Sequence, residues 1–262
     1  MPVSPGRCCK MKIRVLGSGT SSGVPVIGCN CAVCTSENSK NKRSRASILI
    51  QNDGYNVLID TATEFRLQAL AAGIRRIDGV FFTHAHADHI HGLDDLRPLS
   101  HKKSIAVFAD ADTREEIETR FSYIFNHQGR GGGVPRIHLH TVGSDPVECC
   151  GLQVIPIPLL HGDQPILGYR FNSFAYLTDC SGIPETSFAR LQDLDVLVID
   201  ALRYRPHPTH FSVAEALEMI KRIAPGRTYL THLCHDVEYH TLLRELPPGV
   251  EPAYDGLEFE LD

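Results

Sequence analysis

The chain has 262 residues, a formal net charge of −5 and a hydrophobic fraction of 42 %. That length suits one large α/β domain or two small ones, and the ordinary composition excludes disordered and fibrous classes. The net acidity argues against a broad polyanion-binding surface, so we expect no large nucleic acid as partner. No apolar run is long enough to cross a bilayer, and the first ten residues lack the apolar stretch of a signal peptide. We therefore expect a cytoplasmic protein without a membrane partner, with a disordered tail at 1–10 and a single domain at 11–262.

Strand and helix patterns alternate along the chain. The first part predicts strands at 12–16, 45–50, 55–60, 79–83 and 104–108, and helices at 63–72 and 113–125. Asn52-Asp53-Gly54 is typical of a hairpin turn, and the glycine-rich stretch 128–133 is predicted to be a mobile loop. The last part predicts strands at 137–142, 152–158, 167–171, 174–178, 196–199 and 228–231, and a helix at 213–223. Strands with helices at intervals favour sheets covered by helices in a layered α/β domain.

The motif Thr83-His84-Ala-His86-Ala-Asp88-His89 is the most informative feature of the sequence. His84 and His86, two positions apart at an extended strand end, point the same way and can share one ion. Asp88 and His89 follow where the chain turns, and they can reach a second ion. Imidazole with carboxylate suits Zn²⁺, Mn²⁺ or Fe²⁺, whereas a polar turn of solvated histidines is the simpler alternative.

Three further apolar runs end in a potential metal ligand. His161 follows the strand ending at Pro158, Asp179 ends the strand Tyr176-Leu-Thr, and His232 ends the strand Tyr229-Leu-Thr. Loops at one edge of a sheet line a common site, so these side chains are expected to meet the first motif. Two four-ligand ions that share one carboxylate need seven side chains, and the chain supplies His84, His86, Asp88, His89, His161, Asp179 and His232. Asp60 also ends a strand, but a buried carboxylate with satisfied oxygens explains it more simply.

On these residues the sequence resembles the metallo-β-lactamase superfamily from about Met11 onward. The resemblance implies an α/β fold, the αββα sandwich of two mixed β-sheets flanked by helices, with two metal ions at one rim. It implies one ion on His84, His86 and His161, the other on Asp88, His89 and His232, and Asp179 with a hydroxide between them.

A second cluster of potential ligands follows the glycine-rich turn at residues 17–23. A dinucleotide-binding turn is excluded, because Ser22 stands where the third glycine would be needed. Cys29, Cys31 and Cys34 suit three corners of a tetrahedral zinc site, and Cys234 or His235 offers the fourth. A Cys31-x-x-Cys34 redox pair is the alternative. Buried or incidental thiols are the simpler interpretation of the remaining cysteines, which are Cys8, Cys9, Cys149, Cys150 and Cys180.

The two clusters together resemble the PhnP-like phosphoribosyl 1,2-cyclic phosphate phosphodiesterase group of this superfamily. The resemblance implies a structural Zn²⁺ on Cys29, Cys31, Cys34 and His235. It also implies a metal-dependent phosphoric diester hydrolase whose hydroxide, bridging two Mn²⁺ or Zn²⁺ ions, attacks a small cyclic phosphodiester. His210, which opens a helix, would protonate the leaving oxygen, and Asp88 would be catalytic as well as a ligand.

Several alternatives remain open at this point. Cyclic nucleotides and small nucleotide-like diesters fit the same site. A ribonuclease Z-like tRNA 3′-endonuclease shares the metal positions, but its arm lies between the ligands matching His161 and Asp179, where this chain has only 18 positions. A zinc-stabilised metal-sensing protein is the non-enzyme alternative, although structural sites are normally closed. The segment 110–136 is a candidate substrate lid or homodimer contact.

Overall fold

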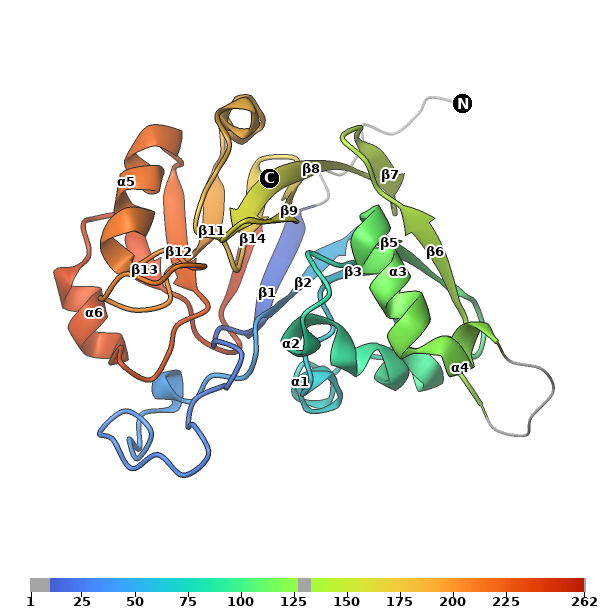
Figure 1. The fold of residues 1–262 in the computed structure, drawn as a ribbon, viewed down its shortest axis with the longest axis horizontal. Coiled ribbons are helices and arrows are strands. Elements are labelled where there is room, and N and C mark those ends of the chain that lie inside the picture. The colour runs from blue at the N-terminus through green and yellow to red at the C-terminus, as the bar shows by residue number, and fades with distance from the viewer. Residues whose placement is uncertain (1–9, 127–132, 262) are drawn as a thin grey trace, which may run out of the picture.

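The computed structural model describes residues 10–126 and 133–261. Within these ranges the chain forms two seven-stranded β-sheets packed face to face, with helices on both outer sides (Figure 1). The expected αββα sandwich is therefore confirmed. The predicted tail, apart from Lys10, and nearly all of the predicted loop at 128–133 lie outside the described residues, so both stay predictions.

The first sheet has the strand order β14-β1-β2-β3-β4-β5-β6. Its strands are β1 (Met11–Gly17), β2 (Ser47–Asn52), β3 (Tyr55–Ile59), β4 (Gly79–Phe81), β5 (Ile105–Ala109), β6 (Ile137–Thr141) and β14 (Glu258–Leu261). Pairing is antiparallel from β14 to β3 and parallel from β3 to β6. The predicted hairpin turn joins β2 to β3, where Asp53 and Gly54 have φ values of 47° and 79°.

The second sheet has the order β13-β12-β11-β10-β9-β8-β7. Its strands are β7 (Val147–Cys149), β8 (Leu152–His161), β9 (Gln164–Phe171), β10 (Phe174–Leu177), β11 (Val196–Asp200), β12 (Arg227–Thr231) and β13 (Val250–Pro252). Pairing is antiparallel from β7 to β10 and parallel from β10 to β13. Both sheets are therefore mixed, as the resemblance implies.

Helical segments cover the outer face of each sheet (Figure 1). Those over the first sheet are α1 (Phe65–Ala71), α2 (Ala87–Ile90), η2 (His91–Leu99), α3 (Ala111–Arg120) and α4 (Ser122–Phe125). Those over the second are η3 (Glu185–Leu191), α5 (Val213–Ile223) and α6 (Tyr239–Glu245). The prediction of one helix over 113–125 is wrong in one respect, because Phe121 leaves helical geometry and separates α3 from α4. None of the helices in the described ranges is long and apolar enough to span a bilayer.

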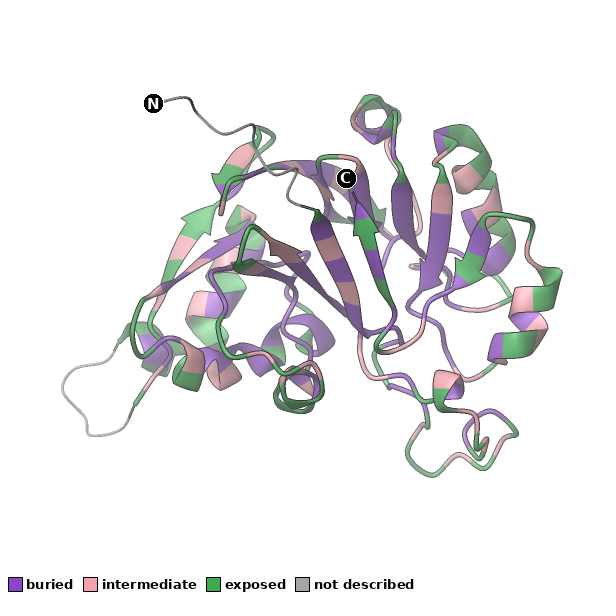
Figure 2. Cartoon of the chain, turned by 180° about the vertical axis from the view of Figure 1, so that it is seen from behind, coloured by how far each residue is buried: buried purple, intermediate pink, exposed green. Residues whose placement is uncertain are grey.

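Three hydrophobic layers hold the sandwich together. Phe81, Tyr169 and Phe174 belong to the central layer between the sheets. Two further layers join each sheet to its own helices: Phe65 and Leu93 lie in one, and Leu197 and Leu230 in the other. Figure 2 shows the result, with buried residues along both sheets and exposed ones on the outer helices and loops. The rigid strands thus place their ends at fixed positions.

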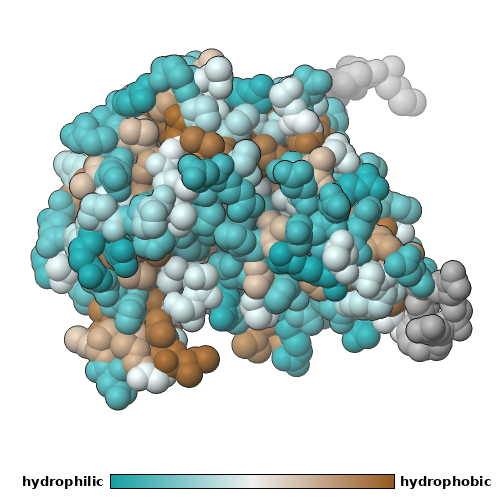
Figure 3. Space-filling view, in the orientation of Figure 1, coloured by the Kyte–Doolittle hydropathy of each residue, from teal (hydrophilic) through white to brown (hydrophobic). Residues whose placement is uncertain are grey.

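A long arm, residues 20–42, leaves the body of the molecule after β1 and returns before β2. It forms the blue loops at the lower left of Figure 1, with η1 (Ser39–Asn41) near its end. Brown, apolar atoms gather at the same corner in Figure 3, and Ile27 is 99 % exposed. A small cluster of Val24, Val33 and Cys34 is the arm's own core. So small a core indicates that the arm needs another source of stability.

Candidate metal centres and active site

The seven predicted ligands come from strand ends that meet at one edge of the sandwich. His84 and His86 follow β4, α2 carries Asp88 and His89, His161 ends β8, Asp179 follows β10, and His232 follows β12. The contacts below show that the structure brings all seven together. His86 is exposed at the mouth of the site, whereas the other six are buried.

Asp179 lies between the two halves of this group. Its Oδ1 is 3.1 Å from Nε2 of His232 and 3.3 Å from Nε2 of His89, and its Oδ2 is 3.8 Å from Nε2 of His84. Asp88, His89, Asp179 and His232 offer ligand atoms that all lie within 4.8 Å of one another. His161, Asp179 and His210 form a second such set. Asp179 belongs to both donor sets, which is the position that a carboxylate bridging two metal ions would occupy.

Three imidazoles make up the other side of the site. The ring centroids of His84 and His86 are 4.5 Å apart, those of His86 and His161 are 5.0 Å apart, and those of His84 and His161 are 5.5 Å apart. The three rings predicted to share one ion are thus mutual neighbours. They come from two different sheets.

Several buried polar atoms of these residues lack a hydrogen bond within the described ranges, which is expected if they bind a metal ion. Nε2 of His84, His89 and His232 and Oδ2 of Asp88 are buried, and none finds a hydrogen-bond partner in the described part of the chain. These atoms lie at ion-pair distance from one another or from Asp179, yet none forms a hydrogen bond to any described residue. A buried polar group without a hydrogen bond costs about 1–3 kcal/mol, so such a concentration needs an explanation. Ligands about 2.1 Å from a tetrahedral ion lie about 3.4 Å apart, close to the 3.1–3.3 Å separations around Asp179. Imidazole and carboxylate at this spacing fit divalent cations.

The second nitrogen of several rings is held by a neighbouring group. Nδ1 of His89 is 2.7 Å from Oδ2 of Asp60, and Nδ1 of His161 is 2.7 Å from the Asp179 carbonyl oxygen. Both bonds leave Nε2 facing the centre, as outer-shell partners of metal-binding histidines do. The Asp60 oxygens also accept from the N–H and the hydroxyl of Thr83 at 2.9 Å. Asp60 is therefore the buried, satisfied carboxylate that the sequence favours.

The backbone is unusual at the strand ends that carry these groups. Asp60, Asp179 and His232 have φ values of 62°, 54° and 59°. Residues with a Cβ rarely adopt this left-handed conformation, and they keep it where the surrounding structure enforces it. At Asp179 and His232 this turn directs the side chain off its strand and into the shared site, and at Asp60 it directs the carboxylate to Nδ1 of His89.

Charge in the site is balanced between carboxylates and imidazoles. Burial opposes the charged form of His232, but Asp179 and its neighbours outweigh burial and raise the pKa of His232 to about 10. Burial also opposes ionisation of Asp179, yet His232 and His89 hold the pKa of Asp179 well below its usual range. The site therefore concentrates negative charge that protons neutralise, and a divalent cation would compete with those protons.

His210 lies beside the metal-ligand candidates, paired with a carboxylate that the sequence analysis missed. Its Nδ1 is 3.1 Å from Oδ2 of Asp200, the last residue of β11. The His210 ring centroid is 4.8 Å from those of His161 and His232. Asp200 carries the same signal as Asp179, an apolar strand that ends in a carboxylate, so the sequence could have identified it.

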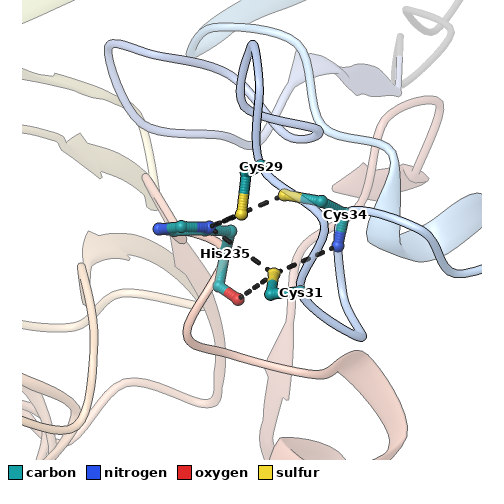
Figure 4. A group of neighbouring side chains, drawn as sticks. All are labelled: Cys29, Cys31, Cys34 and His235. Carbon is teal, nitrogen blue, oxygen red and sulfur yellow. Dashed lines mark hydrogen bonds between the residues drawn. The ribbon is translucent and has the colours of Figure 1, made fainter.

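The three predicted thiols of the arm meet His235, as Figure 4 shows. Nδ1 of His235 is 3.2 Å from Sγ of Cys29 and 3.6 Å from Sγ of both Cys31 and Cys34. A hydrogen bond from the N–H of Cys34 lowers the pKa of Cys31 to about 6, despite opposing burial. Three thiols and one imidazole at this spacing suit a tetrahedral zinc ion.

The structure distinguishes the two candidates for the fourth corner of that site. Cys234 turns away from the thiols, and its Sγ accepts from the N–H of Asp236 at 3.3 Å. The loop that carries His235 is braced by the buried guanidinium of Arg43, which donates to the carbonyl oxygens of Cys234 and Val237. The geometry thus places His235, and not Cys234, with the arm.

Comparison with known proteins identifies the class that this fold and these sites define. Residues 55–233 match the family model described as a beta-lactamase superfamily domain, and the chain belongs to that superfamily. A solved structure described as a new diphosphatase from the PhnP family is 43 % identical, with a TM-score of 0.91, over 96 % of this chain and 97 % of its own. The chain is therefore a member of the PhnP-like group.

Two curated relatives extend the comparison. A Porphyromonas gingivalis protein named octanoyltransferase is 41 % identical over 96 % of this chain and 52 % of its own length. An Azoarcus protein named coenzyme PQQ synthesis protein B is 32 % identical over 68 % of this chain and 56 % of its own. The chain spans about half the length of these curated relatives. Its membership of the PhnP-like group supports a hydrolase, and the superfamily fold implies that it binds divalent metal.

Proposed function

We propose that the protein hydrolyses a small phosphodiester, such as a phosphoribosyl 1,2-cyclic phosphate, at a site that holds two divalent metal ions. The observation that carries the proposal is the position of Asp179 between two sets of imidazole and carboxylate donors. A single structural ion would need one closed set of four ligands, whereas this cluster offers more donors than one ion can use. The proposal assigns His84, His86 and His161 to one ion and Asp88, His89 and His232 to the other, with Asp179 shared.

The metal ions, Mn²⁺ or Zn²⁺, would lower the pKa of a bound water and offset charge on the phosphoryl oxygens. The chain's own residues position the reacting groups. Asp88 has a buried Oδ2 without a hydrogen-bond partner among the described residues, and we assign it to orient the attacking water. His210, whose Nδ1 faces Asp200, keeps Nε2 to hold the proton that the leaving oxygen needs.

The arm has a separate role in this proposal. A structural Zn²⁺ on Cys29, Cys31, Cys34 and His235 would tie the arm to the loop that begins at His232. His232 and His235 are three residues apart, so zinc would also steady one ligand of the active site. The proposed division into a tail and one domain, 11–262, keeps both sites in a single unit.

A diphosphate is the second candidate substrate class. The solved relative that is 43 % identical is described as a diphosphatase, and its match covers nearly all of both chains. An internal phosphorus of a diphosphate ester, like that of a phosphodiester, carries two bridging oxygens. The same in-line displacement would serve both, with phosphate instead of a sugar oxygen as leaving group.

A tRNA 3′-endonuclease fits the chain less well. The interval between His161 and Asp179 holds only β9, β10 and tight turns, and every residue of it is described. That leaves this interval without an arm to hold tRNA. The net charge of −5 also disfavours a large polyanion. A small substrate is therefore proposed, and a homodimer contact through 110–136 stays a proposal.

The experiment is a substrate panel on metal-depleted protein reloaded with Mn²⁺ or Zn²⁺. The panel holds a phosphoribosyl 1,2-cyclic phosphate, a cyclic nucleotide, ADP-ribose as a diphosphate diester, bis(p-nitrophenyl) phosphate and an unprocessed tRNA. We expect metal-dependent hydrolysis of small phosphoesters, abolished by chelation and restored by metal. The Asp179→Ala protein serves as the matched inactive control. Cleavage of tRNA alone, or no hydrolysis with either metal, would overturn the proposal.

A further inference from the structure

The loop that carries His210 presents a second histidine to the same site. This loop runs from β11 to α5, and its other histidine is His207. The ring centroid of His207 lies 5.1 Å from that of His210. His210 is buried and His207 is partly exposed, so His207 stands on the outer side of the pair.

Hydrogen bonds give the two rings different proton arrangements. Nδ1 of His207 accepts from the backbone N–H of Thr209 at 3.3 Å, and the Thr209 hydroxyl is 3.2 Å away. Because a backbone N–H can only donate, Nδ1 of His207 carries no proton, and the neutral ring must carry it on Nε2. Nδ1 of His210 faces an Asp200 carboxylate, which can only accept. His210 thus keeps Nε2 for proton transfer, whereas Nε2–H of His207 is a fixed donor.

The surroundings of His207 favour a ring that stays neutral and well positioned. Burial, the nearby His210 and Arg203 all lower the pKa of His207. Arg203 donates from Nε to the Arg205 carbonyl oxygen at 3.2 Å and from Nη2 to the Pro206 carbonyl oxygen at 3.1 Å. These bonds hold the chain immediately before His207, so little ordering is needed for the ring to bind a ligand.

The loop between β11 and α5 also packs against the β8–β9 turn, which follows the metal-ligand candidate His161. A Cβ built on Gly162, next to His161, would lie 3.1 Å from Cγ2 of Thr209. Thr209, which bonds the His207 ring, therefore lies against the β8–β9 turn, and the His207 ring lies beside that of His210. A phosphorus held at the cluster would have its leaving group on the His210 side, within reach of the outer ring.

We propose that His207 binds the leaving group of the substrate through Nε2–H and favours leaving groups rich in oxygen acceptors, such as a phosphate or a sugar, over an aryl oxide. This inference rests on the proposed phosphoester hydrolysis. It narrows the substrate class to esters whose leaving group carries an acceptor oxygen close to the one that departs. A diphosphate diester has such an oxygen, whereas the nitro oxygens of a p-nitrophenyl ester lie on the far side of the ring. His210 supplies the proton, and His207 fixes the group that receives it.

The test compares His207→Ala and His207→Gln with the parent on ADP-ribose and on bis(p-nitrophenyl) phosphate. Loss of one neutral hydrogen bond should raise KM for ADP-ribose about five- to tenfold, with a smaller rise for the nitrophenyl ester. The Gln variant, whose amide keeps an N–H donor, should recover most of the loss. His101→Ala is the matched control, because His101 is exposed and its backbone carbonyl oxygen, which the substitution keeps, accepts a hydrogen bond from Arg136.

Two kinetic outcomes would overturn the inference while leaving the proposed function intact. One is parent-like KM values for both substrates in His207→Ala, and the other is an equal loss on both substrates. A ¹⁵N spectrum of the His207 ring that shows a protonated Nδ1 would also overturn it. If the parent itself hydrolyses no phosphoester with either metal, the proposed function fails instead, so the two failures are distinguishable.

Discussion

Asp179 is the residue on which the proposed active site depends most. Its carboxylate reaches His89 and His232 through one oxygen and His84 through the other, and it belongs to both donor sets. The unusual φ of 54° holds it in that place. The other two carboxylates at nearby strand ends, Asp60 and Asp200, contact Nδ1 of His89 and of His210 instead.

Replacing Asp179 by alanine should therefore abolish hydrolysis without unfolding the protein. Loss of a residue that only hydrogen-bonds a metal ligand already lowers metal affinity or activity about 10–100-fold. Loss of a ligand shared by two ions should therefore lower activity by more than about 100-fold. The measurement is kcat on the preferred substrate together with bound metal per chain and far-ultraviolet circular dichroism. A folded variant with parent-like turnover would show that Asp179 does not bridge the ions.

His210→Ala should have an effect that depends on the leaving group. Nitrophenolate departs without a proton, whereas a sugar oxygen needs one. We therefore expect kcat to fall about 100-fold or more for the sugar ester only. Comparing kcat for a ribose phosphodiester and for bis(p-nitrophenyl) phosphate measures this difference. Equal slowing of both substrates would remove His210 as the acid.

The metal-ligand candidates were predictable because each signal is local. His84, Asp179 and His232 all follow short apolar strands, and that pattern is visible without a structure. Asp200 carries the same pattern but was not singled out. The role proposed for His207 could not be predicted from the sequence, because it depends on the hydrogen bond from Thr209 and on the neighbouring His210 ring.

At the scale of elements, the thiol site joins the arm at residues 20–42 to the body of the molecule. Its own apolar cluster is small, and the contacts of Cys29, Cys31 and Cys34 with His235 join it to the far end of the chain. Arg43 adds two hydrogen bonds to the same loop. Zinc at this position would therefore contribute directly to folding.

Cys31→Ser should lower thermal stability more than it changes the reaction. A loss of about 2 kcal/mol in the free energy of unfolding corresponds to a fall in Tm of about 5 °C or more for a chain of this size. Differential scanning calorimetry and zinc content measure the effect, and Cys234→Ser is the matched control because its Sγ turns away from the site. Unchanged Tm and zinc content with altered redox behaviour would favour the Cys31-x-x-Cys34 redox pair.

Element boundaries were less predictable than element types. β8 continues past Pro158 to His161 because β9 pairs with it from Val154 to His161, and that pairing is not a local signal. β7, β13 and β14 were not predicted, since each is short and gains its stability from the neighbouring strand. The break at Phe121 likewise depends on packing, because Phe121 is buried in the layer below β5 and β6.

At the scale of the whole molecule, the site exists because the carboxyl ends of the parallel strands of two sheets face one edge. β4 leads into the motif from His84 to His89, and β10, β11 and β12 lead to Asp179, Asp200 and His232. Neither sheet alone carries the donors for two ions. Strand patterns predicted the sheets, but their face-to-face packing followed only from the resemblance, since no local signal determines how two sheets pack.

Anomalous diffraction at the zinc and manganese edges, on crystals of the metal-loaded protein, tests the two-ion site most directly. We expect two peaks flanking the carboxylate of Asp179 and a third, at the zinc edge alone, between the arm thiols and His235. A single ion on Asp200, His210 and His232, or an absence of density beside Asp179, would contradict the two-ion account and the hydrolysis derived from it.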